Sequence, residues 1–365
     1  MRDDTIPATA PSTSKSFPIP AARDTALDGM RAVAVLLMIA SHTTRLITWD
    51  ERREWSRFSL LIEPLTASLF LILVGASLVQ SYRKAQATGA SRAAWLRRQG
   101  LRALALWVLS AIFYIASEGF LLPDALVLSG ILATIAYTSV VGSLLVAGPR
   151  PALSLALAAG ALMALYAWID LKEIRIFILN AGNSPLFPLS IFGLLGSLGA
   201  LALSARVRWL KPLMLACAVL AMGTLLWHHG FREVFSKPMG RYETARMFLV
   251  ESKGAKVEKN IPYYNLRIIL VPAILPLAVL LYALLAALRP LLDRSASWLL
   301  RLGRRSLDVY ILHLAILSIL VLTGGKRPLK ESWLGDAVFL GVIGICYLWV
   351  WGRDAYRSRR MVDAP

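Results

Sequence analysis

Residues 27–42 read LDGMRAVAVLLMIASH, a short apolar run with ionisable side chains near both ends. Arg31 and His42 are eleven positions apart, so an α-helix places them on one face, about 16.5 Å apart along its axis. Asp28 lies within pairing distance of Arg31 on that face. Ionisable residues are costly inside a membrane and usually face a helix-bundle interior or an aqueous cavity. The pattern fits equally well with Arg31 as an interfacial anchor and His42 as a hydrogen-bonded core residue.

The composition of the whole chain indicates that lipid surrounds such runs. Apolar residues make up 57% of the 365 residues and charged residues 17%, whereas soluble domains carry about 25% charged residues. The mean hydropathy is +0.60, and the apolar runs have the length of membrane-spanning helices. The sequence therefore predicts an all-α, polytopic integral membrane protein.

Ten membrane-spanning segments are predicted from these runs, near residues 27–48, 60–82, 101–120, 125–147, 152–169, 185–203, 210–227, 266–288, 302–322 and 337–351. Lys and Arg cluster after the second, sixth, eighth and tenth segments, which all end on one side. That side is cytoplasmic by the positive-inside rule, so both termini are expected inside.

The predicted organisation has three parts. Residues 1–25 are expected to be a disordered tail, residues 26–352 the transmembrane domain, and residues 353–365 a basic cytoplasmic tail. The transmembrane domain includes a large outer loop at 228–265. Its mixed charges and tyrosines suit either a solvated loop or a lid over a polar substrate.

The net charge of +18 comes from short basic clusters between apolar segments rather than from one continuous patch. Such clusters favour anionic lipid headgroups as partners, and no nucleic-acid partner is predicted. Cys217 and Cys346 both lie within apolar runs, where cysteine usually packs as a small hydrophobic residue. Because no spacing typical of a metal site occurs, no metal is predicted.

Three separated stretches of the chain share a pattern. They are LDxxR at 27–31 followed by His42, FLILVGASL at 70–78, and GRRSLDVYILH at 303–313. Together they resemble the transmembrane acyltransferase superfamily, which comprises acyltransferase family 3 and the heparan-alpha-glucosaminide N-acetyltransferase-like proteins. Ala32 stands where the family usually has glycine, and Val74 stands where family 3 proteins commonly have serine.

The resemblance implies a membrane acyltransferase that moves an acyl group, expected to be acetyl, from cytoplasmic acetyl-CoA to a hydroxyl or amine. The implied acceptor is an extracytoplasmic glycan or lipid-linked saccharide. The implied location is the bacterial inner membrane, where such a reaction modifies polysaccharides. A transporter or flippase of a polar or lipid-linked molecule is the alternative, because it would also bury Arg31 and His42 in a cavity.

The resemblance also implies roles for three residues. His42 is the expected general base, because histidine titrates nearest to neutral pH; a transient acyl-histidine is a variant of that mechanism. Arg31, nearer to the cytoplasm, is expected to bind a phosphate of coenzyme A or to hold the geometry of the site. Asp28 is expected to orient Arg31. The thioester supplies the reactive carbon, so this chemistry requires no metal.

Four further residues complete the predicted site. Arg97 and Arg98, in the basic loop after the second segment, are predicted to engage phosphates of coenzyme A, although topology explains this loop equally well. Ser77 and His313 are predicted to line the substrate cavity. Since the first and ninth segments both run outward, His313 should lie at a depth similar to that of His42. A core histidine bonded to a neighbouring helix is the equal alternative for His313.

Overall fold

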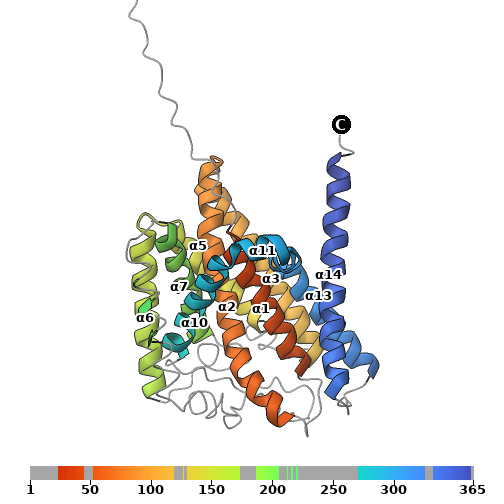
Figure 1. Cartoon of the computed structure of the whole chain (residues 1–365). Coiled ribbons are helices and arrows are strands. Elements are labelled where there is room, and N and C mark those ends of the chain that lie inside the picture. Colours follow the sequence, from red (N-terminus) through yellow and green to blue (C-terminus); the bar gives the residue numbers. More distant parts are fainter. Residues whose placement is uncertain are drawn as a thin grey trace, which may run out of the picture.

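A computed structural model of the chain describes residues 24–44, 52–118, 130–172, 186–204, 270–324 and 332–362, with a few single positions between 126 and 220. Within these residues every regular element is a helix (Figure 1), which confirms the predicted all-α class. Most of the predicted seventh segment, the outer loop at 228–265 and the N-terminal tail up to residue 23 lie outside the described residues.

The described helices can be given in chain order. They are α1 (Thr25–Thr44), α2 (Arg52–Ala87), α3 (Arg92–Glu118), α5 (Ile131–Val146), α6 (Pro151–Leu171), α7 (Leu186–Ser204), α10 (Leu270–Ala287), α11 (Arg289–Ser295), α12 (Ser297–Arg304), α13 (Ser306–Gly324) and α14 (Ser332–Val362).

Local sequence explains where several of these helices begin and end. The Asp24 carboxylate accepts hydrogen bonds from the backbone N–H groups of Ala26 and Leu27 in the first turn of α1, at 3.0 and 3.3 Å, which is N-capping. The Ser91 hydroxyl caps α3 in the same way. Gly89, with φ 72°, supplies the left-handed residue after α2, and Pro151 opens α6, where its missing N–H is harmless.

Four described helices are long and apolar enough to cross a membrane: Thr25–Thr43, Leu65–Ala87, Pro151–Ile169 and Trp333–Arg357. A fifth crossing results if α10 and α11, which are bent by 64° at their junction, cross together. Three shorter apolar helices are Ile131–Val146, Leu189–Leu203 and Ser306–Leu320. These helices identify a membrane protein, while the predicted count of ten spans is not confirmed.

Outward faces of the helices are apolar, as a lipid environment requires. On α3 the exposed side chains Leu101, Leu104, Val108 and Ile112 recur every three or four residues and form one stripe. Large exposed apolar residues also cover α6 and α14. Leaving such stripes in water would forfeit the hydrophobic contribution to folding, so they are suited to contact with lipid.

Many of the basic residues that set the predicted orientation lie, within the described residues, towards one end of the bundle. The turn from α2 to α3, the turn from α5 to α6 and the C-terminal end of α14 all lie at the top of Figure 1. These segments carry Arg83, Lys84, Arg92, Arg97, Arg98, Arg150, Arg353 and Arg357. The clusters therefore share an end, as a single cytoplasmic side would require.

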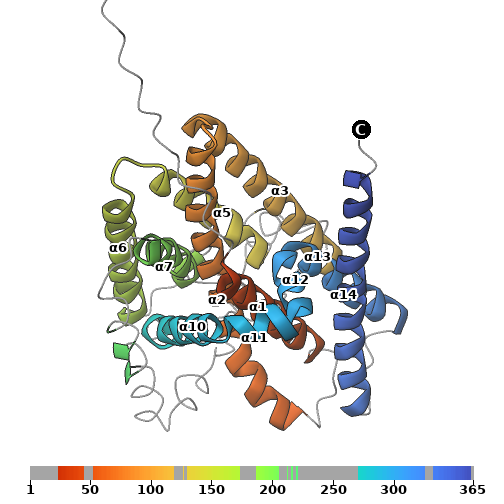
Figure 2. The same ribbon diagram turned by 45° about the horizontal axis from the view of Figure 1, so that its top comes forward.

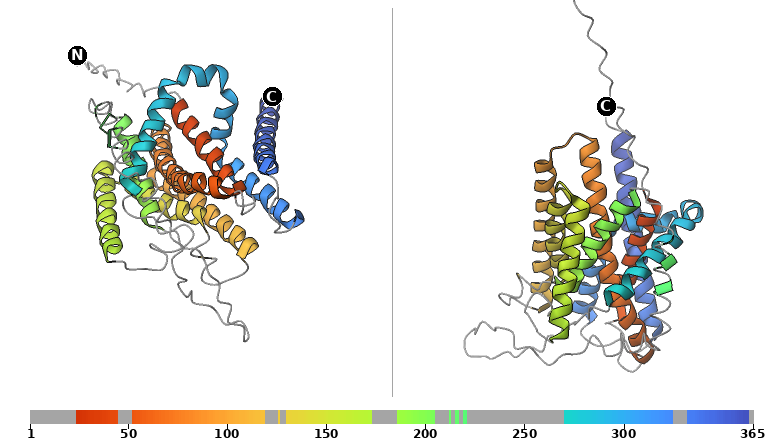
Figure 3. Two further views of the ribbon diagram at one scale, coloured as in Figure 1. Left: turned by 60° about the horizontal axis from the view of Figure 1, so that its bottom comes forward. Right: turned by 90° about the vertical axis from the view of Figure 1, so that its left-hand side faces the viewer.

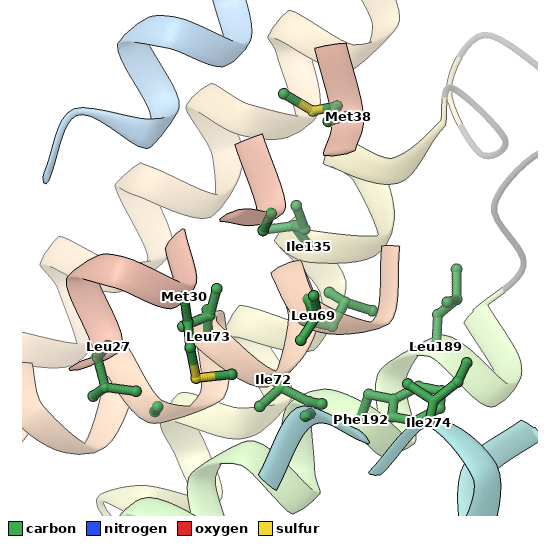
Figure 4. Close-up of a cluster of buried hydrophobic side chains, with 14 of the residues drawn as sticks. Leu27, Met30, Met38, Leu69, Ile72, Leu73, Ile135, Leu189, Phe192 and Ile274 are labelled. Carbon is green, nitrogen blue, oxygen red and sulfur yellow. The ribbon is translucent and has the colours of Figure 1, made fainter. Parts of the chain in front are cut away.

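Helix α1 lies inside the bundle and contacts α2, α10, α11, α12, α13 and α14. The α10–α12 segment forms an arch around one end of α1 (Figures 2 and 3). In the main hydrophobic core, Met30 and Met38 of α1 join Ile72 of α2, Phe192 of α7 and Ile274 of α10 (Figure 4). The apolar run that carries Asp28, Arg31 and His42 therefore forms a central helix of the bundle.

Two glycines allow backbones to approach closely. A Cβ on Gly75 of α2 would overlap the Gly193 carbonyl of α7. A Cβ on Gly303 of α12 would overlap the Asp28 carbonyl of α1 and lie 3.0 Å from the Ala32 nitrogen. Small residues permit such close contacts between membrane helices. Gly75 and Gly303 belong to the second and third sequence motifs, so these motifs fix how α2 and α12 pack.

The structure corrects three predicted boundaries. The ninth segment, predicted as one run over 302–322, is divided because α12 ends at Arg304 and α13 begins at Ser306. Arg97 and Arg98 lie within α3 rather than in a loop, and α14 continues to Val362 through most of the predicted basic tail. Apolar runs mark only the lipid-embedded part of a helix, whereas arginine is a good helix former and extends the helix beyond it.

Candidate active site

One helix carries the three residues that the first motif predicted. Asp28 and Arg31 lie near the start of α1, and His42 lies near its end. The side chain of Asp28 is fully buried, and that of Arg31 is 18% exposed. Because α1 is central, other helices can supply partners at both of its ends.

The Asp28 carboxylate lies between two guanidinium groups. Arg31 Nη1 donates to Asp28 Oδ1 at 2.5 Å, and Arg304 Nε of α12 donates to Asp28 Oδ2 at 3.3 Å. Arg31 Nη2 also donates to Ser77 Oγ of α2 at 2.8 Å, and that hydroxyl donates to the Leu73 carbonyl. We call Asp28, Arg31, Ser77 and Arg304 the arginine cluster. Its charged groups carry one positive charge in excess, which suits an anionic ligand.

Asp28 and Ser77 both contact Arg31 directly, whereas the role of Asp28 in orienting Arg31 and that of Ser77 in the substrate cavity stay predictions. No site role was predicted for Arg304, although it belongs to the third sequence motif. The available signal was its position directly after Gly303 in the third motif, since the close contact of Gly303 with α1 carries Arg304 to Asp28.

A pair of histidines lies towards the other end of α1. His42 Nδ1 is 2.8 Å from His313 Nε2 of α13, which confirms the prediction that the two residues lie at similar depth. His313 is fully buried, and its Nδ1 is 3.1 Å from the Val309 carbonyl oxygen of its own helix. We call His42 and His313 the histidine pair.

Aromatic rings surround the buried member of the pair. The Tyr310 ring meets the His313 ring edge to face, with centroids 5.4 Å apart. Phe70 of α2 packs in the same manner on Tyr310 at 6.3 Å. Phe70 starts the second motif, and Tyr310 and His313 lie in the third. The three separated sequence motifs therefore meet around α1.

Arg97 and Arg98 lie apart from this arrangement. Both are exposed on α3, a helix whose main contacts are with α5 rather than α1. Neither side chain forms an ion pair or hydrogen bond with another residue of the described ranges. Their predicted contact with coenzyme A stays a prediction.

Within the described residues, no three His, Cys, Asp or Glu side chains lie close enough to share a metal ion. The groups assembled around α1 are those of proton transfer and anion binding: two imidazoles, two guanidinium groups, one carboxylate and one hydroxyl. A neutral imidazole can take a proton from a hydroxyl or amine, and guanidinium groups bind phosphate.

Comparison with known proteins shows a family for this chain. Residues 23–216 match the family model described as heparan-alpha-glucosaminide N-acetyltransferase, catalytic. This range is just over half of the 365 residues. It contains Asp28, Arg31, His42 and Ser77, whereas Arg304 and His313 follow it in the chain. No curated protein sequence matches the chain.

Proposed function

The chain belongs to the heparan-alpha-glucosaminide N-acetyltransferase catalytic family, and from this premise we propose that it transfers acetyl from cytoplasmic acetyl-CoA to a hydroxyl or amine of an extracytoplasmic glycan. Membership implies an acetyltransferase, and the apolar helices indicate that it acts in a membrane. The donor, the acceptor and the sidedness are the proposed parts.

One observation carries the proposal: α1 carries a hydrogen-bonded arginine near one end and an imidazole near the other. Arg31 belongs to the arginine cluster and His42 to the histidine pair. Their separation along the helix axis is about 16.5 Å. In coenzyme A a long pantetheine arm separates the phosphates from the thioester. A donor held by its phosphates at the arginine cluster can therefore present its thioester towards His42.

The arginine cluster is proposed to hold the phosphates of the donor. Arg31 is held on two sides, by Asp28 and Ser77. Arg304 is about half exposed, so it can reach a ligand outside the helix contact. Guanidinium groups suit phosphate because they form bidentate hydrogen bonds. Arg97 and Arg98 are proposed to attract the same anion from the cytoplasm, at a greater distance from α1.

His42 is proposed to be the general base. The acceptor O–H or N–H gives its proton to His42 as the acceptor atom forms a bond to the thioester carbonyl carbon. The carbon–sulfur bond then breaks, and the leaving coenzyme A thiolate takes the proton from the imidazolium. The sum is transfer of acetyl from sulfur to oxygen or nitrogen, with His42 restored.

The proposed setting is the bacterial inner membrane, with the basic end of the bundle facing the cytoplasm and anionic lipids. The glycan or lipid-linked saccharide would approach from the other side. The family match favours this enzyme over a transporter or flippase, because the matched family is one of acetyltransferases.

The test uses the purified full chain in lipid nanodiscs with acetyl-CoA and an amino-sugar glycoside. We expect release of the coenzyme A thiol together with an acetylated glycoside detected by mass. In cells, glycans from a strain that lacks the protein should lose an acetyl group. Flux of the glycoside across proteoliposomes without covalent change would instead establish the transporter and overturn the proposal.

A further inference from the structure

The two rings of the histidine pair meet edge to edge. Their planes are nearly parallel, at 10°, and their centroids are 5.1 Å apart. Stacked rings cannot approach closer than van der Waals contact, about 3.5 Å, yet His42 Nδ1 and His313 Nε2 are 2.8 Å apart. That distance is one of a hydrogen bond. Because the two planes are nearly parallel, the rings are roughly coplanar at this contact. The N–H of one ring then points directly at the nitrogen lone pair of the other.

The direction of this hydrogen bond follows from a third group. The Val309 carbonyl oxygen can only accept, so His313 Nδ1 carries a hydrogen and donates to it at 3.1 Å. In a neutral imidazole one nitrogen donates and the other accepts. His313 Nε2 is therefore the acceptor, and His42 Nδ1–H is the donor. It follows that the lone pair of His42 is on Nε2.

The opposite direction requires a charged His313. If Nε2 donated as well as Nδ1, His313 would be an imidazolium. His313 is fully buried, and in the described part of the chain no carboxylate forms an ion pair with it. A buried charge without an ionic partner is strongly disfavoured. The stable arrangement is therefore a series of hydrogen bonds between neutral groups, from His42 to His313 and from His313 to the Val309 carbonyl.

We infer that His313 is a positioning residue that fixes the tautomer of His42, so that His42 Nε2 is the atom that takes the acceptor proton. The inference rests on the proposed acetyl transfer. When Nε2 takes that proton, His42 becomes an imidazolium while its Nδ1–H stays hydrogen-bonded to His313. His313 thus holds the ring's orientation and accepts from the cation, without changing its own proton count. Serine hydrolases use a carboxylate for this task; here a neutral imidazole serves.

The tautomer can be measured directly. The chain has four histidines, His42, His228, His229 and His313, so nitrogen NMR of histidine-labelled full chain in lipid gives few signals. Spectra of the His42→Gln and His313→Gln proteins assign the pair. We expect a protonated Nδ1 on His42 in the unaltered protein. A His42 that is protonated on Nε2 instead would overturn the inference, whatever the enzyme activity.

Substitution of His313 separates positioning from packing. His313→Phe keeps a ring but removes the acceptor, so the Nδ1–H signature of His42 should be lost. The kcat should fall by about 10²-fold or more, as for loss of a correctly oriented base, while KM for acetyl-CoA changes little. His313→Gln can accept with its amide oxygen and should restore part of kcat. If kcat fell in His313→Phe with the His42 signature unchanged, the inference would be wrong.

Thr43→Val is the matched control. Thr43 is buried next to His42, and among the described residues its hydroxyl bonds only to the Ile39 carbonyl of the same helix, at 2.8 Å. This variant loses a buried polar group of α1 without touching the histidine pair, so the tautomer and kcat should stay near those of the unaltered protein. A shifted His42 signature here would show that any polar loss disturbs it, against the inference. If the unaltered protein transfers no acetyl at all, the proposed function fails, and the NMR result still decides the tautomer.

Discussion

Gly303 of α12 packs directly on the backbone carbonyl of Asp28 in α1, at a separation that leaves no room for a Cβ. The next residue, Arg304, donates to the Asp28 side chain. The close backbone contact and the ion pair therefore depend on each other. A change in the packing of Gly303 should therefore alter the position of Arg304 in the arginine cluster.

Gly303→Ala tests this dependence. The added methyl must push α12 away from α1, and overpacking of this kind costs about 1–3 kcal/mol. We expect a lower melting temperature and a raised KM for acetyl-CoA. Gly160→Ala is the control, because nothing lies within 4 Å of the position its Cβ would take. Equal melting temperatures for the two variants would contradict the packing argument.

Arg31 should be needed for donor binding. Arg31→Ala removes the hydrogen bonds to Asp28 and Ser77 and leaves Asp28 with less compensating charge, so acetyl transfer should be weakened or abolished. Arg31→Lys keeps the charge but cannot reproduce the two-sided hydrogen bonding. Its rate of acetyl transfer should therefore lie between that of Arg31→Ala and that of the unaltered protein. Steady-state kinetics against acetyl-CoA concentration measure the effect. Full activity of Arg31→Ala would reduce Arg31 to a membrane anchor.

Arg304 should contribute to binding of the same anion from α12. Arg304→Gln is expected to raise KM for acetyl-CoA several-fold, with kcat less affected, and to weaken the dependence of KM on salt, because a screened charge is lost. Arg301→Gln, one turn earlier on α12, removes an equal charge that has no ion pair with another described residue. If both substitutions raise KM alike, only the net charge of this end matters.

His42 should be the residue most sensitive to substitution. Asn can retain a hydrogen bond at this position but cannot take up a proton near neutral pH. General-base catalysis typically contributes about 10²–10⁴-fold, so His42→Asn should lose at least that order in rate. Circular dichroism and thermal melting should stay near those of the unaltered protein. A folded His42→Asn protein that retains more than about a tenth of the rate would remove His42 from the mechanism.

The orientation of the chain can be tested with reporters that work on one side of the membrane only. Fusions after Arg98, Arg206 or Arg360 should report the cytoplasm, because Lys and Arg are retained there. Insertions between Arg232 and Lys259 should report the outer side. The reverse pattern at two or more sites would contradict the ten-helix topology and the proposed sidedness.

The sequence alone was enough to predict relationships between residues that lie close together in the chain. Asp28, Arg31 and His42 share a helix face because their spacing matches the helical period, and the ion pair of Asp28 with Arg31 follows from a separation of three residues. The all-α class followed from composition in the same way. Helix ends were less predictable: Arg97 and Arg98 were assigned to a loop because the apolar run starts after them, but the helix does not stop where lipid does.

Only the tertiary structure decided which partners α1 has. His313 lies 271 positions from His42, and Arg304 lies 276 positions from Asp28. The spacing of residues within α1 predicts neither of these contacts. Their contacts depend on how α12 and α13 are rotated and at what depth they lie. The close approach of Gly303 to α1 and the break between α12 and α13 at Arg305 determine this rotation and this depth. The sequence by itself determined which residues α1 presents on one face. The packing of distant helices decided which nitrogen of His42 donates, because that depends on the atom placed opposite it.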